Sequence, residues 1–404
     1  MSSGILRVDG GDLRGGRVHV KRYGESISAK RQSMSETRSV AMPRMAWISP
    51  ILAILFYPIA SATGFKDHLA PGAFGLVLAI VLIPVIFGAI FSAVYHAEII
   101  AHRTGEPYGT LVLTAAVTII EVALIASVMM SGSDASPALA RDTVFAVVMT
   151  VCTGLTGICI LLGGLRYREQ DFSVAGASAY LTVLLVLAAL TLILPNYTQE
   201  VPGPAFSDAQ LAFVAIVTIV LYGAFLYIQT VRHRDYFIAP SAGEGGDSEF
   251  HPSSRQLTLS VVLLLLGLVA VVLLSKKFAV VVEIGRLAVG APAPVTGLVV
   301  AMLILLPEGI AAVQAARRNE LQKALNLALG SSLATIGLTF PAVAVVSLVL
   351  DKPLVLGLEQ SESVLLALAL LVGTTTFATG RTNILYGFVH LVIFATFIFL
   401  TFQP

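Results

Sequence analysis

Long apolar stretches without charged side chains follow one another along most of this chain of 404 residues. A helix needs about 20 apolar residues to cross the hydrocarbon core of a bilayer, where only helices and closed barrels satisfy the backbone. Apolar residues make up 56% of the sequence and charged residues 12%, whereas soluble domains carry about 25% charged residues. The sequence therefore predicts an all-α integral membrane protein and excludes a soluble globular one.

The lengths of the apolar stretches predict eleven transmembrane helices. The stretch after residue 256 is the hardest to divide, and we interpret it as one long, tilted helix followed by a span that begins near Pro294. The predicted spans are 46–64, 73–100, 109–131, 143–165, 174–195, 209–231, 256–289, 294–316, 324–350, 361–379 and 383–402.

Lysine and arginine are unevenly divided between the two sides of this topology, which sets its orientation. Residues 1–45 are basic and polar, lack the apolar region of a secretory signal, and are expected to form a disordered cytoplasmic tail. With the tail inside, the inner segments carry Arg103, Arg166, Arg168, Arg232, Arg234, Arg255, Arg317, Arg318, Lys323 and Arg381, and the outer ones carry Lys66, Arg141, Lys276, Lys277, Arg286 and Lys352. The sequence thus predicts a cytoplasmic N-terminus and an outside C-terminus, most simply in a bacterial inner membrane.

Two glutamates interrupt otherwise uncharged spans near their middle. Glu121 lies in TLVLTAAVTIIEVALIASVMM and Glu308 in PVTGLVVAMLILLPEGIAAVQAA. A charge at that depth costs about 2.5–3.5 kcal/mol on insertion scales, so such residues usually line an ion path or a substrate site. The pair indicates a transporter, with a buried, permanently protonated glutamate as the alternative for each position.

The two glutamate spans belong to a predicted internal repeat. Each follows a proline-containing segment (GEPYG at 105–109, GAPAPVTG at 290–297), and each precedes a span rich in small and hydroxyl residues (TVCTGLTG at 150–157, GSSLATIG at 330–337). Five spans per copy is an odd number, so the second copy is inverted, as in many secondary transporters with a midplane site. The simpler alternative is that apolar helices resemble each other by composition.

This repeat predicts how the chain is divided. We expect a peripheral transmembrane helix over 46–72, a first five-helix repeat over 73–231, a cytoplasmic loop over 232–255 and a second five-helix repeat over 256–404. The fold class is therefore eleven transmembrane helices, with one peripheral helix and two inverted repeats.

Several motifs resemble those of a known family. HAEIIAHRTGEPYGTLVLTAAVTIIEVAL (96–124), APVTGLVVAMLILLPEGIAAVQA (293–315), GSSLATIGLTFP (330–341) and FATGRTNILYGFVHL (377–391) are similar to ChaA-type calcium/proton antiporters, in the cation/proton exchanger branch of the cation/calcium exchanger superfamily. The resemblance implies exchange of Ca²⁺, or of Na⁺ and K⁺, for H⁺, with Glu121 and Glu308 as the paired ion-binding glutamates. The sequence departs from that branch at Thr118-Ile119-Ile120 and Leu306-Pro307, where fewer side-chain oxygens flank the glutamates, and in the loop 232–255, which is weakly acidic.

Paired carboxylates suit such an exchange, because each can hold either a proton or a metal ion. Ca²⁺ takes six to eight oxygen ligands, so we expect about two protons to replace one Ca²⁺ at a shared site. The candidate secondary ligands are Thr118, Thr153, Ser331, Ser332 and Thr335, together with carbonyls freed where Pro307 is expected to break its helix. The alternative for each hydroxyl is a bond to its own helix backbone.

Glu98 and Glu283 lie nearer the ends of their spans and are candidates for a proton pathway, with a plain interfacial charge as the alternative. His96 is expected to anchor at the membrane interface, and His390 to pack or bond locally. Cys152 and Cys159 cannot bond to each other along one helix and are expected to be small core residues.

Three functions remain as alternatives. A channel could use the same acidic pair as a selectivity ring, although inverted repeats favour alternating access. An intramembrane enzyme lacks support, since the sequence offers neither HExxH nor a nucleophile–base arrangement. The closest rival is an antiporter for Na⁺ or K⁺ at the same site. We expect no cofactor and no nucleic-acid partner; the expected partners are inorganic cations, protons and the lipid bilayer, and no sequence feature sets the oligomeric state.

Overall fold

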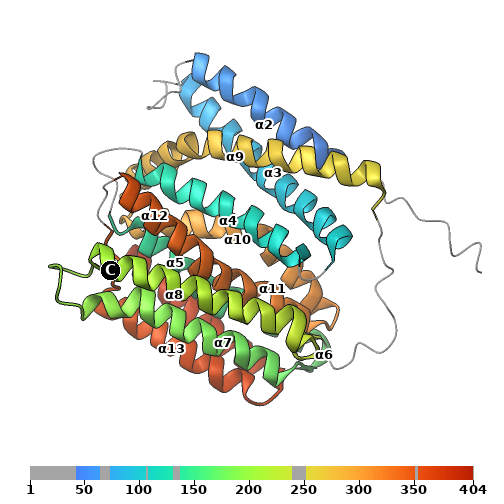
Figure 1. Cartoon of the computed structure of the whole chain (residues 1–404), viewed down its shortest axis with the longest axis vertical. Coiled ribbons are helices and arrows are strands. Elements are labelled where there is room, and N and C mark those ends of the chain that lie inside the picture. The colour runs from blue at the N-terminus through green and yellow to red at the C-terminus, as the bar shows by residue number, and fades with distance from the viewer. Residues whose placement is uncertain are drawn as a thin grey trace, which may run out of the picture. The chain divides into compact units, whose positions relative to one another are not determined.

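The computed structural model describes residues 42–63, 73–105, 108–130, 137–238, 252–350 and 354–403. Within them, eleven helical spans are long and apolar enough to cross a membrane (Figure 1). The elements are α2 (Arg44–Ala62), α3 (Ala73–Thr104), α4 (Tyr108–Met129), α5 (Leu139–Met149), η1 (Thr150–Leu155), α6 (Thr156–Tyr167), β1 (Glu169–Asp171), α7 (Val174–Ala188), η2 (Ala189–Ile193), η3 (Leu194–Asn196), α8 (Asp208–Tyr227), η4 (Ile228–Arg232), η5 (Arg234–Phe237), α9 (Ser254–Ala288), α10 (Pro294–Arg317), α11 (Leu321–Ala334), η6 (Thr335–Thr339), α12 (Phe340–Leu350), α13 (Gln360–Phe377), β2 (Arg381–Asn383) and α14 (Ile384–Phe402).

The predicted spans correspond to the observed helices one by one. The long helix expected over 256–289 is α9, and the following span begins at Pro294 as expected. One expectation is wrong: Pro307 does not break its helix, because α10 runs without interruption from Pro294 to Arg317. The proline still removes one amide from the helical ladder.

Irregular turns occur elsewhere, as π-helical segments that the sequence analysis did not predict. Two of them, η1 and η6, each interrupt a buried span, Leu139–Tyr167 and Leu321–Leu350. Both combine threonine with glycine, in the sequences TVCTGL and TIGLT. A π turn widens the helix and displaces backbone carbonyls from the regular ladder, and such turns are frequent at functional sites.

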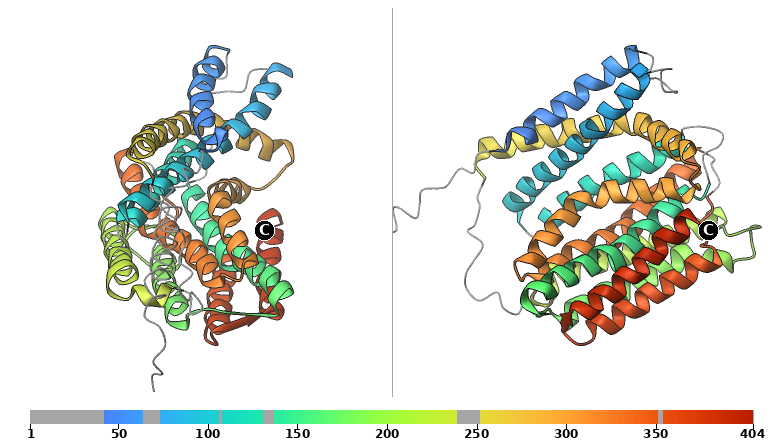
Figure 2. Two further views of the ribbon diagram at one scale, coloured as in Figure 1. Left: turned by 90° about the vertical axis from the view of Figure 1, so that its right-hand side faces the viewer. Right: turned by 180° about the vertical axis from the view of Figure 1, so that it is seen from behind.

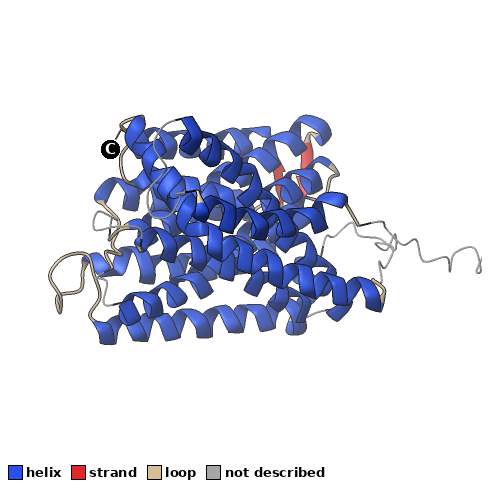
Figure 3. Cartoon of the chain, turned by 90° about the horizontal axis from the view of Figure 1, so that it is seen from above, coloured by secondary structure: helices blue, strands red, loops and turns tan. Residues whose placement is uncertain are grey.

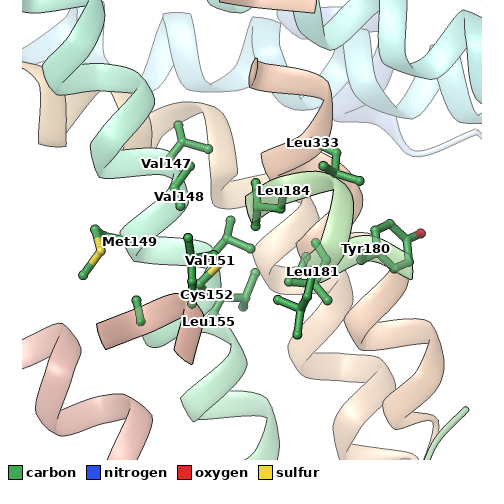
Figure 4. Close-up of a cluster of buried hydrophobic side chains, with 14 of the residues drawn as sticks. Val147, Val148, Met149, Val151, Cys152, Leu155, Tyr180, Leu181, Leu184 and Leu333 are labelled. Carbon is green, nitrogen blue, oxygen red and sulfur yellow. The ribbon is translucent and has the colours of Figure 1, made fainter. Parts of the chain in front are cut away.

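The helices pack in two groups around α4 and α10. The long helices α3 and α9 pack along each other and carry α2, while α7 packs between α8 and α13 on the opposite side (Figures 1 and 2). A large core cluster joins α5 and η1 to α7 and α11; Cys152, Leu184 and Leu333 belong to it (Figure 4). Cys152 and Cys159 are buried and not bonded to each other.

Close contact between α5 and α10 depends on a glycine. A Cβ atom placed on Gly297 would lie 2.8 Å from the backbone nitrogen of Thr143. Since this distance leaves no room for a side chain, only glycine lets the two helices approach so closely here.

Two short strands form the main departure from helix. β1 pairs antiparallel with β2, so that Gln170 lies opposite Thr382 (Figure 3). The short connection between the last two spans therefore contains a strand, β2. The pairing satisfies backbone groups at the ends of α6 and α14 without changing the all-α class.

Two polar expectations are also corrected. Arg141, expected in an outer loop, lies within α5 and is buried together with Asp142. The two side chains form an ion pair at 2.7 Å, which allows both charges to be buried. His96, expected at the interface, is fully buried, and its ring nitrogens contact Ser260 Oγ and the Ala46 carbonyl.

Several expectations fall on residues that the structure does not describe. The N-terminal tail as far as residue 41 and most of the loop 232–255, with Glu244, Asp247 and Glu249, lie outside the described residues.

Candidate cation site

Glu121 is held in place by two threonines from a distant part of the chain. It lies in α4, with 2% of its surface exposed. Its Oε2 accepts hydrogen bonds from Thr335 Oγ1 at 3.2 Å and from Thr339 Oγ1. Both donors belong to η6, so α4 and η6 meet at this carboxylate.

Glu308 lies on α10, close enough to Glu121 for their charges to repel. Its residue surface is partly exposed, but the Oε2 atom is buried and has no hydrogen-bond partner among the described residues. The structure therefore brings together the two glutamates that the sequence analysis selected.

Unpartnered buried oxygens are concentrated on the same elements. In the part of the chain that the structure describes, the buried side-chain atoms without a hydrogen-bond partner are Glu121 Oε1, Glu308 Oε2, Thr150 Oγ1, Ser332 Oγ, Ser61 Oγ and Gln170 Oε1. The first four belong to α4, to α10 and to the two spans that contain η1 and η6. Since buried polar atoms nearly always have partners, these oxygens are suited to a hard cation, which takes carboxylate and hydroxyl oxygens.

The secondary ligands proposed from sequence have different surroundings. Thr335 bonds directly to Glu121, and Ser332 is fully buried with its Oγ unpartnered. Thr153 donates its hydroxyl proton to the Met149 carbonyl within its own helix, which leaves its oxygen lone pairs available. Thr118 and Ser331 are partly exposed, and the structure gives no contact from either to the two carboxylates.

The two outlying glutamates differ from each other. Glu98 is exposed on α3 and lies within electrostatic range of Glu308 on one side and of His102 and Lys323 on the other. Glu283 lies near the end of α9, where it is ion-paired with Arg286 and accepts a hydrogen bond from Thr296 Oγ1 at 3.4 Å. Only Glu98 is therefore brought near the glutamate pair.

Thr339 was not among the ligands predicted from the sequence. Its signal was present, because Thr335 and Thr339 are four residues apart and lie on one face of a helical turn. Thr150 was not among the selected ligands either, since an orphaned hydroxyl can be recognised only from the tertiary structure. Groups of three or more His, Cys, Asp and Glu side chains that could hold a metal are absent from the described residues, so a cation here would rely on hydroxyl and backbone oxygens too.

Eleven apolar spans around two neighbouring glutamates, Glu121 buried and Glu308 with a buried Oε2 atom, define an integral membrane protein of the ion-transporter class. The chain belongs to the sodium/calcium exchanger protein family, which matches residues 74–231 and 259–403. It is similar to y4hA of Sinorhizobium fredii, whose name describes an ionic transporter, with 43% identity covering 92% of this chain and 100% of that one. It is also similar to the sodium-potassium/proton antiporter ChaA of Escherichia coli, with 38% identity covering 80% and 88% of the two chains.

The fold has a counterpart among solved structures. The Ca²⁺/H⁺ antiporter protein YfkE superposes with a TM-score of 0.66 over 90% of this chain and 100% of that chain, at 18% sequence identity. At this identity the likeness shows a shared fold, and it agrees with the eleven-span architecture expected from the sequence.

Proposed function

We propose that this protein is a secondary-active cation/proton antiporter in which cations and protons compete for Glu121 and Glu308. The observation that carries the proposal is the set of four unpartnered buried oxygens on the two glutamates, Thr150 and Ser332. Membership in the sodium/calcium exchanger family and the relationship to a sodium-potassium/proton antiporter support the same activity.

The chemistry of exchange follows from burial. An isolated charge in a membrane is costly, so a buried carboxylate is stable when it is protonated or when it binds a cation. Because the charges of Glu121 and Glu308 repel each other, both ionise together only when a cation neutralises them. One divalent cation then replaces two protons, and a monovalent cation replaces one. The site is therefore never empty with both carboxylates charged, whichever way the cation is transported.

The remaining ligands come from hydroxyl and backbone oxygens. Thr335 and Thr339 orient the Glu121 carboxylate through Oε2, which leaves Oε1 free to bind the cation. Ser332 and Thr150 offer two more oxygens, and the carbonyl opposite Pro307 lacks its helical amide. These groups supply part of the six to eight oxygens that Ca²⁺ takes.

Protons reach the site, in this proposal, along α3 through Glu98. This carboxylate is exposed and is electrostatically coupled to Glu308 on one side and to Lys323 on the other. Glu283 is left out of the route, because its ion pair with Arg286 occupies both of its carboxylate oxygens.

The membrane and the orientation follow from charge. The basic segments between spans favour an N-terminus in the cytoplasm and a C-terminus outside, and the two relatives named above come from bacteria. We therefore propose location in a bacterial inner membrane.

Calcium is the proposed principal cation, because two neighbouring carboxylates balance one divalent charge. The test is cation-driven dissipation of a preset pH gradient in inverted vesicles that lack other exchangers, with Ca²⁺, Na⁺ and K⁺ compared. Wild type should respond most strongly to Ca²⁺, and Glu121→Gln and Glu308→Gln should both be silent. Glu320→Gln, which changes a glutamate at an exposed ion pair with Lys323, is the matched control and should remain active. Full activity in either site variant would exclude the two-glutamate site.

The relationship to ChaA of Escherichia coli favours a second candidate, a Na⁺(K⁺)/H⁺ antiporter at the same site. In that case Na⁺ or K⁺ would dissipate the gradient more strongly than Ca²⁺, while both glutamine variants would still be silent. The same assay therefore separates the identity of the cation from the identity of the site.

A further inference from the structure

His390 of α14 is a fully buried side chain that makes contact with two other elements. Its Nδ1 lies 2.8 Å from the carbonyl oxygen of Cys152 in η1. Its Nε2 lies 3.1 Å from Oγ1 of Thr376 in α13. The imidazole thus joins the last span to a π segment that lies more than two hundred residues earlier in the chain.

These two contacts define the protonation of the ring. A carbonyl oxygen can only accept, so Nδ1 must carry a proton and donate it to Cys152. A hydroxyl can donate or accept, so Nε2 of the neutral ring can accept from Thr376, and both ring nitrogens are then hydrogen-bonded without a buried charge. We assign this tautomer from the hydrogen-bond partners.

The Cys152 carbonyl belongs to a wide turn that is held by side chains. Within the same turn, Thr153 Oγ1 donates to the Met149 carbonyl, and Thr156 Oγ1 donates to the Val151 carbonyl at 2.8 Å. Those two donors belong to the span itself, whereas His390 reaches Cys152 from another helix. Thr150, whose unpartnered hydroxyl belongs to the proposed cation site, is the first residue of this turn.

Glycines allow α14 to come within reach of η1. A Cβ atom on Gly154 would lie 3.0 Å from the ring of Phe394, and one on Gly157 would lie 3.1 Å from His390 Cβ and 2.9 Å from Leu391 Cγ. The two helices therefore approach almost to backbone contact. In such packing, a shift of the imidazole is transmitted to the turn.

We propose that His390 is a positioning residue for the cation site: its Nδ1 donor fixes the Cys152 carbonyl and, through the π turn, the position of the Thr150 hydroxyl. The inference rests on the proposed function, since it concerns the same site. It predicts that a variant without the Nδ1 donor has a higher KM for the cation, and not merely a lower melting temperature.

The test compares four variants for the dependence of proton flux on Ca²⁺, Na⁺ or K⁺ concentration. His390→Asn places an amide donor near the position of Nδ1 and keeps the bond to Cys152, whereas His390→Gln places it near Nε2 and keeps only the contact with Thr376. His390→Leu removes both contacts, and Thr376→Val removes the second alone. Melting temperature with and without each cation, measured on the purified protein, gives a readout of binding that is independent of transport.

We expect His390→Gln and His390→Leu to raise the KM for the driving cation about tenfold, as the loss of one buried hydrogen bond implies. His390→Asn and Thr376→Val should stay within about threefold of wild type. The cation-induced rise in melting temperature should shrink in the first pair and persist in the second. Because Asn and Gln are both polar and similar in size, this comparison remains informative if the leucine variant fails to fold.

Equal KM values in wild type, Asn and Gln variants would overturn the positioning role, as would equal losses in Asn and Gln. So would a lower melting temperature with unchanged cation affinity, which is the result of a purely structural contact. Failure of the proposed function is distinct: wild type would then show neither cation-driven proton flux nor a cation-induced shift, and the inference about His390 would fall with it.

Discussion

At the scale of single residues, the two carboxylates of this protein have unequal surroundings. Glu121 accepts two hydroxyl donors from η6 through one oxygen, whereas no side-chain donor to the Glu308 carboxylate is seen among the described residues. A donor that points at a carboxylate stabilises its charged form. If the pair binds a cation as proposed, we expect Glu121 to ionise and bind it before Glu308 does.

Thr339 tests this asymmetry. Thr339→Val keeps the shape of the side chain but removes a donor to Glu121, so the ionised carboxylate loses about 1–3 kcal/mol of stabilisation. We expect the KM for the driving cation to rise about tenfold or more in the vesicle assay. Thr339→Ser keeps the hydroxyl donor, so its KM for the driving cation should be close to that of wild type. Thr396→Val, which removes an exposed hydroxyl bonded to its own helix, is the control and should leave the KM unchanged. An unaltered KM in Thr339→Val would contradict the role of this donor.

The unpartnered hydroxyls lead to an unusual expectation. Ser332→Ala removes an oxygen that has no hydrogen bond to lose, so the melting temperature in cation-free buffer should stay the same or rise. The stabilisation produced by added cation should shrink, because one ligand is gone. Thr191→Val is the matched contrast, since its buried hydroxyl bonds to the Leu187 carbonyl: its melting temperature should fall while the cation-induced shift persists. A fall in cation-free stability for Ser332→Ala would show that this hydroxyl has a partner.

At the scale of the elements, the site is assembled by helices that pack across the chain. α4 meets η6, α10 packs on α5 and η1, and the close approach of α5 to α10 depends on Gly297. The fifth span of each predicted repeat also packs on a π segment of the other repeat: α8 packs on η6, and α14 packs on η1. The π segments η1 and η6 are thus each supported by helices from the other half of the sequence.

Gly297→Ala measures how tight this packing is. The added methyl would lie 2.8 Å from the Thr143 nitrogen, so α10 must shift away from α5. We expect a loss of about 1–3 kcal/mol, seen as a lower melting temperature in detergent. Gly223→Ala in α8 meets no atom within 4 Å and is the control, where a gain of up to about 1 kcal/mol is expected from helix propensity. Equal melting temperatures for the two variants would argue against the close contact.

The buried ion pair of α5 permits a second test at this scale. Arg141 binds Asp142 at 2.7 Å and also donates to the Gly357 carbonyl at 3.1 Å, which ties the segment before α13 to α5. Arg141→Met leaves Asp142 buried without its partner, and we expect a loss of about 3–5 kcal/mol in thermal unfolding. The double variant Arg141→Met, Asp142→Asn should recover most of it. If the double variant is no more stable than the single one, the cost lies in the lost bond to Gly357 rather than in the unpaired charge.

At the scale of the whole molecule, the odd number of spans decides the topology. In the proposed topology, eleven spans would put the two ends of the chain on opposite sides of the membrane, and a repeat of five spans would make the two glutamate helices antiparallel. In the proposed mechanism, with one glutamate on each half, a relative movement of the halves would expose the shared site to either side.

Reporter fusions test this topology. Alkaline phosphatase, which is active only outside the cytoplasm, should be active when it is fused after Gln403 and inactive when it is fused after Arg317. A fluorescent protein that requires the cytoplasm should give the opposite pattern at the two positions. The reverse result at both sites would invert the proposed orientation. Equal activity at both would contradict the three spans expected between Arg317 and Gln403.

The sequence alone determined the class of fold and the number of spans, and it selected Glu121 and Glu308 as the candidate pair. These features depend on local physics: a helix must satisfy its own backbone in lipid, about 20 apolar residues must cross the core, and a charge at that depth is costly. Pro307, Arg141 and His96 show where this reasoning ends. Each was assigned from its own segment. The helix α10 continues through Pro307, Arg141 is paired with Asp142 and bonded to the Gly357 carbonyl, and His96 contacts groups of α2 and α9.

Only the tertiary structure decided which oxygens meet the glutamates. Thr339 reaches Glu121 from a span more than two hundred residues away, and Ser332 differs from Ser331 only by the side of the helix that packing covers. Whether His390 contacts a lipid or the Cys152 carbonyl depends in the same way on the glycines of the opposing helix. Hydropathy is a property of each segment, whereas coordination requires atoms from several segments at one point, and close packing between helices is what brings them there.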